Sequence, residues 1–197
     1  MAPHLAPFQP PLGPQPANAH IYSPHQVTLQ MKEKVFSLSG DDFTIRTVDG
    51  LDVCTCHGKM VSARDSKKFT DMSGAALFTL KNKMLSISKS FHGESPHGQH
   101  DFEVKGHFKL MGSHSTVTFK NAADGVAVEL EVKGDWMDRS AEISYGGRPV
   151  AAIQRSYFNV REIWGDKQTY FVVVAPNVDL SLIAGLCVCL DEKENEK

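Results

Sequence analysis

An apolar run near the C-terminus, Leu180–Leu190, constrains the fold of this chain more than any other feature. Asp179 precedes the run and is a favourable helix N-cap, because its side chain accepts free backbone N–H groups and its charge suits the positive end of the helix dipole. The run predicts a helix of about eleven residues, or roughly 16 Å. A membrane span needs about 20 residues and about 30 Å, so this helix is too short to cross a bilayer.

The apolar side chains of this run surround the whole helix and leave no polar stripe. A helix of this kind is buried on every side. We therefore expect the rest of the domain to enclose it, and we assign a structural, core-filling role to Leu180, Leu182, Ile183, Leu186 and Leu190. After Leu190 the chain becomes charged, and we expect it to emerge into solvent and end in a charged tail, residues 193–197.

Between Gln26 and Pro176 the hydrophobic pattern has a period of two, which gives a strand one buried face and one solvated face. Turn signals at Asp49-Gly50, Asp124-Gly125 and Gly146-Gly147 separate such stretches. The pattern predicts strands at 27–31, 43–46, 53–56, 77–80, 85–91, 102–108, 116–119, 126–132, 141–145, 150–154 and 169–174. Many short strands and one fully apolar helix predict a mainly β fold in which a sheet wraps around the helix.

The first segment of the chain is rich in proline: seven of the ten prolines lie between Met1 and Pro24. Proline removes a backbone donor and fixes φ, so this composition predicts an extended, disordered tail. The alternative is a ligand for a proline-recognition domain, but no basic residue flanks the prolines. The predicted organisation is a tail at 1–25, a barrel domain at 26–192 and the charged tail.

Charge and cysteine usage restrict the class of protein. The formal net charge of −2 gives no overall attraction to nucleic acid, and the N-terminus lacks the basic and apolar regions of a secretory signal. Cys54 and Cys56 are two residues apart, as are Cys187 and Cys189. A disulfide within such a pair would be strained, so we expect reduced thiols inside the cell. We expect a cytoplasmic monomer that binds no nucleic acid and needs no cofactor.

Six segments carry a family resemblance. They are DFTIRTVDG at 42–50, FTDMSGAALFTL at 69–80, KMLSI at 83–87, FEVKGHF at 102–108, VKGDW at 132–136 and VVAPNVD at 173–179. In this order they resemble the LURP-one-related family, whose domain has the tubby C-terminal-like fold. The last segment, which runs into the apolar helix, is the most specific. The resemblance covers about Val27 to Glu192.

The resemblance implies a mainly β protein, a twelve-stranded antiparallel β-barrel around a buried C-terminal α-helix. It links the domain distantly to tubby proteins, which bind phosphoinositides through surface lysines and arginines, and to phospholipid scramblases. Plant members are associated with pathogen defence, and no catalytic residues are established for the family. This chain departs from the pattern at its proline-rich start, at the His92–His100 loop and at Arg155–Lys167, where we expect a lid or a short helix.

Basic residues on the predicted strands are the candidates for binding an anionic phospholipid headgroup, because a converging group of them would form charge-assisted hydrogen bonds. The five candidates are Lys81, Lys83, Lys89, Lys105 and Lys109. The alternative is an ordinary solubilising surface, in which lysines protect strand edges from pairing with other chains. The sequence favours this second interpretation.

Two groups of potential metal ligands have simpler explanations. His92, His97 and His100 match no metal-binding spacing and lie in a stretch that reads as a polar hairpin loop. Cys54 and Cys56, next to His57, fit core positions as small hydrophobic side chains. We therefore expect no metal site. Because nucleophile elbows, phosphate-binding loops and dinucleotide fingerprints are also missing from the sequence, we expect a non-enzymatic binding or scaffold module, or alternatively a peripheral binder of anionic phospholipid.

Overall fold

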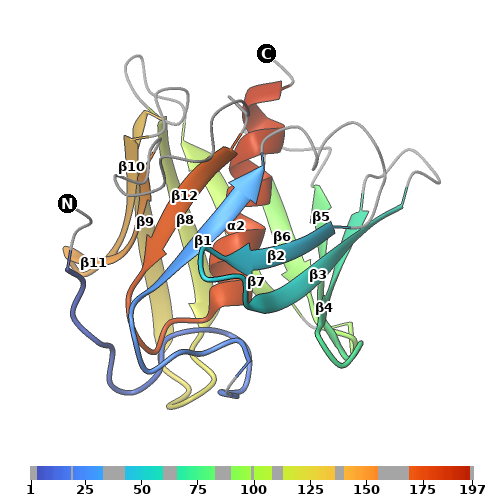
Figure 1. Cartoon of the computed structure of the whole chain (residues 1–197). Helices are drawn as coiled ribbons and strands as arrows, with labels where there is room; N and C mark the ends of the chain where they lie inside the picture. The colour runs from blue at the N-terminus through green and yellow to red at the C-terminus, as the bar shows by residue number, and fades with distance from the viewer. Residues whose placement is uncertain are drawn as a thin grey trace.

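The computed structural model describes residues 4–18, 20–32, 43–59, 66–82, 90–98, 100–107, 113–135, 140–154 and 169–195. These residues form a closed barrel of twelve antiparallel strands, β1 to β12, around the C-terminal helix α2 (Leu180–Asn195), as Figure 1 shows. The predicted fold class is therefore confirmed. The described residues contain no helix with the length and apolar character that crossing a bilayer requires.

The strands follow one another around the barrel in chain order, and β1 closes the ring by pairing with β12. Their bounds are β1 Val27–Lys32, β2 Phe43–Thr47, β3 Asp52–Lys59, β4 Ser66–Asp71, β5 Ala76–Asn82, β6 Ser90–Glu94, β7 His100–His107, β8 Ser113–Lys120, β9 Ala127–Asp135, β10 Ser140–Tyr145, β11 Arg148–Gln154 and β12 Thr169–Val174.

Alternation is clearest in β8, where Ser115, Val117 and Phe119 are buried and their neighbours are partly exposed. Several strands depart from it, and β12 and β4 show two different reasons. All six residues of β12 are buried, as in strands that are covered on both faces. In β4, which alternation did not reveal, the register shifts between Phe69 and Thr70, and both residues are buried. This bulge breaks the period of two on which the prediction depended.

Helix α2 runs along the inside of the barrel (Figure 1). The five side chains assigned to the core are buried, with at most 4% of any of them exposed, as their all-round apolar pattern predicted. At Gly185 an added Cβ would lie 3.1 Å from Cζ of Phe78, so the glycine lets the Phe78 ring on β5 approach the helix. That ring stacks on Phe69 with centroids 4.6 Å apart and meets the edge of Phe102 at 5.0 Å.

The start of α2 agrees with the predicted cap. Oδ1 of Asp179 accepts hydrogen bonds from the backbone N–H groups of Ser181 at 2.9 Å and Leu182 at 3.1 Å. It also accepts one from the Ser181 hydroxyl at 2.6 Å. The helix continues beyond its expected end at Leu190 and reaches Asn195, because the residues that follow the apolar run are also good helix formers.

One end of the barrel, which we call the base, collects the hairpins β2–β3, β4–β5, β6–β7, β8–β9 and β10–β11 and the connection from β12 to α2. The predicted turns are present. Gly146 and Gly147 both have positive φ, 57° and 79°, which a tight two-residue hairpin turn requires at both central positions. The insertion at 155–167, for which a lid or short helix was expected, lies outside the described residues.

The expectation of a disordered N-terminal tail is wrong for the described residues. Residues 4–18 and 20–26, which we call the N-terminal segment, pass under the base (Figure 1). The N–H of Phe8 donates to the carbonyl of Pro176 at 3.1 Å, and the N–H of Leu12 donates to Asn177 at 2.9 Å. The prolines exclude a helix or the interior of a sheet, but they permit an extended conformation. Backbone groups of the base form hydrogen bonds with this extended segment.

Candidate functional site

The lysines proposed for anion binding lie on the outer wall of the barrel where they are described. Lys81, on β5, is paired with Glu94, with 2.5 Å between Nζ and Oε2. Lys105, on β7, is paired with Glu103 at 3.0 Å. A third lysine, Lys133 on β9, is paired with Glu131. The other three candidates, Lys83, Lys89 and Lys109, lie outside the described residues.

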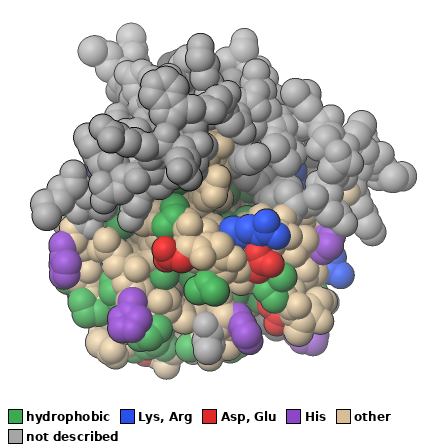
Figure 2. Space-filling model, in the orientation of Figure 1, with side chains coloured by type: hydrophobic (Ala, Val, Ile, Leu, Met, Phe, Trp, Pro, Cys, Tyr) green, Lys and Arg blue, Asp and Glu red, His purple; other side chains and the backbone are tan. Residues whose placement is uncertain are grey.

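The strand register does not bring Lys81 and Lys105 together. Lys81 lies opposite His92 on β6, and His92 lies opposite Glu103 on β7. Lys105 is two residues further along β7. Because β6 lies between β5 and β7, the two strands that carry these lysines are roughly 10 Å apart. On the face shown in Figure 2, basic and acidic side chains also lie beside each other. The described lysines therefore contribute to a mixed surface.

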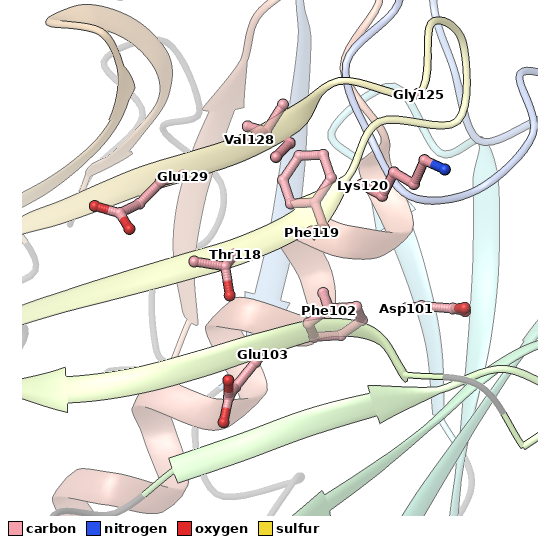
Figure 3. Close-up of a pocket in the computed structure, with 10 residues that line it drawn as sticks. Asp101, Phe102, Glu103, Thr118, Phe119, Lys120, Gly125, Val128 and Glu129 are labelled. Atoms are coloured by element: carbon pink, nitrogen blue, oxygen red, sulfur yellow. The ribbon is translucent and has the colours of Figure 1, made fainter.

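A hollow lies over β7, β8 and β9, with a volume of about 720 Å³ (Figure 3). It is lined by Asp101, Phe102, Glu103, Thr118, Phe119, Lys120, Gly125, Ala127, Val128 and Glu129. Three of these side chains carry a carboxylate and one carries an amine. The lining contains no histidine or cysteine, so it lacks the nitrogen and sulfur ligands that zinc favours.

Cross-strand pairing positions the lining of this hollow. Phe102 lies opposite Phe119, and Phe119 lies opposite Val128; all three are buried. The next row, Glu103 to Thr118 to Glu129, points the other way because side chains alternate along a strand. The aromatic row faces the barrel interior, where Phe102 meets Phe78, and the acidic row faces outward. The acidic row gives the hollow a chemistry that suits a cationic or hydrogen-bond-donating ligand.

Asp101 connects this hollow to the N-terminal segment. Its carboxylate accepts a hydrogen bond from Nε2 of Gln15 at 3.0 Å. Burial raises the pKa of Asp101 above its ordinary value, and the hydrogen bond from Gln15 opposes that shift. Neither residue was a candidate from the sequence, because 86 positions separate them along the chain and no local pattern relates them.

A buried polar network lies at the base around Asp179. Its Oδ2 accepts a hydrogen bond from the N–H of Gln15 at 3.3 Å, and the Tyr22 hydroxyl donates to the Gln15 carbonyl at 2.7 Å. Burial raises the pKa of Asp179 from 3.8 to about 6, against the opposing hydrogen bonds from Ser181, Leu182 and Gln15. Burial also raises the pKa of Tyr22, and the charge of Asp179 adds to that shift.

The cysteines occupy core positions. Cys54 and Cys56 are both fully buried on β3, and all four cysteines are buried thiols. Burial raises the pKa of Cys54, and the neighbouring Cys56 and Asp179 raise it further. A thiol of this kind is a poor nucleophile because the thiolate is disfavoured.

The histidines do not share one loop. His92 is part of β6 and is half-buried, whereas His97 is exposed in the β6–β7 connection. The side chain of His100 lies outside the described part of the structure. Among the residues that are described, no three His, Cys, Asp or Glu side chains are grouped as a metal ion would need.

Comparison with known proteins gives a consistent result. The model of the LURP-one-related family matches residues 27–191. The chain is 28% identical to Protein LURP-one-related 15 of Arabidopsis thaliana over 182 residues, which is 88% of this chain and 83% of the relative. It is 26% identical to Protein LURP1 of the same organism over 178 residues, 87% of this chain and 86% of the relative.

A solved structure gives the same picture of the fold. An X-ray structure of an Arabidopsis thaliana protein has a TM-score of 0.61 to this chain at 22% identity. The match covers 92% of this chain and 99% of the solved one. At this level of identity the likeness establishes the architecture.

Proposed function

The chain belongs to the LURP-one-related family, and from this premise we propose that it is a non-enzymatic binding or scaffold module that recognises its partner with its outer surface. The observation that carries the proposal is the contrast between the inside and the outside of the barrel. Inside, Leu182, Ile183 and Leu186 of α2 occupy the space that other barrels use for a ligand. Outside, the hollow on β7–β9 presents the carboxylates of Asp101, Glu103 and Glu129.

This arrangement supports a cationic partner group at the hollow. Asp101, Glu103 and Glu129 carry negative charge there. Lys105 pairs with Glu103 from the same strand, and Lys120 adds one positive charge to the lining. A lysine or arginine side chain of a protein partner would form charge-assisted hydrogen bonds with these carboxylates.

The test compares two charge reversals on neighbouring strands. Glu129→Lys changes the hollow, and Glu142→Lys changes an exposed glutamate of β10 that does not line it. Affinity purification with each variant should lose partners with the first change and keep them with the second. Equal recovery with both variants would remove the hollow from the proposal. Turnover of a defined substrate that one point substitution abolishes would overturn the non-enzymatic role.

The alternative function is peripheral binding of anionic phospholipid through surface lysines. We place it second, because Lys81, Lys105 and Lys133 are each paired with a glutamate. Sedimentation with phosphoinositide-containing vesicles and with neutral vesicles separates the two functions. Selective pelleting with the anionic vesicles would favour the alternative, and equal pelleting or none would remove it.

The cysteines support a cytoplasmic location as part of the same proposal. The side chains of Cys54, Cys56, Cys187 and Cys189 are buried thiols, and buried thiols fit a reducing compartment. Fractionation should place the protein in the cytosol, and any membrane-bound part should be released by high salt. Retention on membranes through high salt and alkaline carbonate would contradict this location.

A further inference from the structure

The N-terminal segment contacts the base in the way that a bound peptide contacts a receptor. Leu12 pairs in parallel with Val178, and Tyr22 pairs antiparallel with Asp179. The connection between β12 and α2 is therefore the middle piece of three extended stretches, and the N-terminal segment supplies both outer ones. Peptide recognition by strand addition uses this geometry, in which main-chain hydrogen bonds provide affinity.

Main-chain hydrogen bonds join the segment to the base on both sides of this connection. On one side the N–H of Asp179 donates to the carbonyl of Leu12 at 3.0 Å. On the other side the N–H of Leu180 donates to Ile21 at 2.8 Å, and the N–H of Asn177 donates to Ser23 at 2.7 Å. Without the segment these donors and their neighbouring carbonyls would form an open edge, which is a template for pairing with another extended chain.

Side chains of the segment provide the anchors. Five of them are at least 93% buried against the barrel: Leu5, Phe8, Leu12, Ile21 and Tyr22. Residues between them, such as Ala6 and Ala17, are exposed. Spaced apolar anchors on an extended backbone determine specificity in this mode of recognition.

Gly13 makes the fit selective. A Cβ at this position would lie 2.3 Å from Cβ of Asp179 and 2.5 Å from the Tyr22 hydroxyl, and real Cβ atoms do not approach other atoms so closely. The N–H of Gly13 also donates to Oδ1 of Asn121 at 2.9 Å, and its carbonyl accepts from Ala122 at 2.9 Å. The site thus accepts a segment with glycine at this position and rejects one with a larger residue.

The same features make the segment separable from the barrel. It has no helix or strand of its own that would keep it folded in isolation, and its prolines prevent it from forming one. Its few anchors must offset the loss of conformational freedom of about twenty residues. The link to β1 passes through Pro24 and His25, which are both exposed.

From these contacts we propose that the base of the barrel is a peptide-binding groove, which the N-terminal segment fills in the monomer and which the N-terminal segment of a second copy fills in exchange. The groove adjoins the hollow on β7–β9 through the hydrogen bond between Gln15 and Asp101. Its backbone pairing, however, uses the connection between β12 and α2, so this inference does not depend on the partner proposed for the hollow. Exchange of the segment is a route by which one copy of the protein engages another.

The experiment uses the full chain with a protease site inserted between Pro24 and His25. After folding and cleavage, a fluorescent synthetic peptide of residues 4–25 is added and its anisotropy is measured. We expect saturable binding that the unlabelled peptide competes away, while circular dichroism shows that the cleaved barrel stays folded. A native fragment that stays bound and admits no labelled peptide would overturn the proposal. The proposal would also be overturned if the fragment dissociates, the barrel stays folded and the labelled peptide does not bind to it.

Two variant peptides give the matched control. The Gly13→Ala peptide should bind at least tenfold more weakly because of the contact with Asp179. The Ala17→Ser peptide changes an exposed residue and should bind like the original. Equal affinity of all three peptides would show adhesion without a groove and would also overturn the proposal.

Discussion

The N-terminal segment and the start of helix α2 meet at the base of the barrel, yet the segment and the helix are buried by different means. Helix α2 satisfies its own backbone hydrogen bonds and carries a continuous apolar surface. The N-terminal segment has isolated apolar anchors and obtains its hydrogen bonds from the backbone of the connection before α2. The comparison shows that a local hydrophobic pattern reveals burial when an element forms its backbone hydrogen bonds within itself. Burial that depends on a distant backbone leaves no such pattern.

The two ends also differ in what depends on them. The barrel closes around α2, so a change in the helix affects strands on every side. The N-terminal segment contacts only the base, so its loss leaves the ring of strands paired. We therefore expect changes in α2 to have larger effects than changes in the segment.

The largest effect is expected for an acidic substitution in α2. Leu182→Asp places an unpaired charge at a position that is 1% exposed, at a cost of several kcal/mol or more. Since typical domains are stable by only about 5–15 kcal/mol, the variant should be largely unfolded or insoluble. Leu51→Asp, the same change at a position that is 68% exposed, should fold normally.

An aspartate scan of Leu180–Leu190 tests this prediction, with soluble yield and circular dichroism measured for each variant. Each position of the run is buried, so each should be sensitive. A tolerant stripe of three or more positions would mean that one face of the helix is solvated and that the barrel does not enclose it.

The next largest effect distinguishes a packed N-terminal segment from a disordered tail. Deletion of residues 1–24 removes five buried apolar side chains and the main-chain hydrogen bonds to the connection before α2. We expect a net loss of about 3–5 kcal/mol and a melting temperature lower by about 10 °C.

A full-length variant controls for chain length. Changing the five anchors to serine keeps the prolines but removes the apolar contacts, and it should destabilise the protein about as much as the deletion. An unchanged melting temperature in both variants, measured by calorimetry, would restore the interpretation of a disordered tail.

A smaller effect is expected where α2 approaches β5. Gly185→Leu would force its side chain into the Phe78 ring, which lies 3.1 Å from an added Cβ, and overpacking of this kind costs about 1–3 kcal/mol. Gly185→Ala should be close to neutral, because the gain in helix propensity of about 1 kcal/mol offsets a small shift of the ring. Urea denaturation measures both variants, and a stabilising Gly185→Leu would show that the helix and β5 are loosely packed.

The smallest effect concerns Asp179, where the N-terminal segment touches the start of α2. Its pKa is about 6 in the folded protein, against an ordinary value of 3.8 for a solvated aspartate, so the folded protein holds the proton more tightly than the unfolded chain does. Its contribution to stability therefore increases as the pH falls through 6 and is lost as the pH rises. Between pH 7.5 and pH 5 the gain should be about 1–1.5 kcal/mol.

The Asp179→Asn variant isolates this contribution. It has no titratable group at the position, so the difference in unfolding free energy between it and the original protein should change with pH in the stated direction. Urea midpoints at several pH values give that difference. A difference that is constant from pH 7.5 to pH 5, or one that changes in the opposite direction, would contradict the raised pKa.

The sequence by itself determined the features that repeat over short distances. The apolar run at 180–190 predicted a buried helix, and its preceding aspartate predicted the cap. Period-two alternation predicted most strands, because adjacent residues on a strand face opposite sides. The order of the family segments supplied the number of strands and the closed barrel, which alternation alone did not determine.

Only the tertiary structure decided where the N-terminal segment lies and how the site residues combine. Gly13 and Asn121 are 108 positions apart, and Gln15 and Asp179 are 164 positions apart. The pairing of Lys81 with Glu94, and the rows of aromatic and acidic side chains in the hollow, depend on strand register. Register and long-range backbone pairing arise from the closure of the whole barrel, so no local hydrophobic period records them.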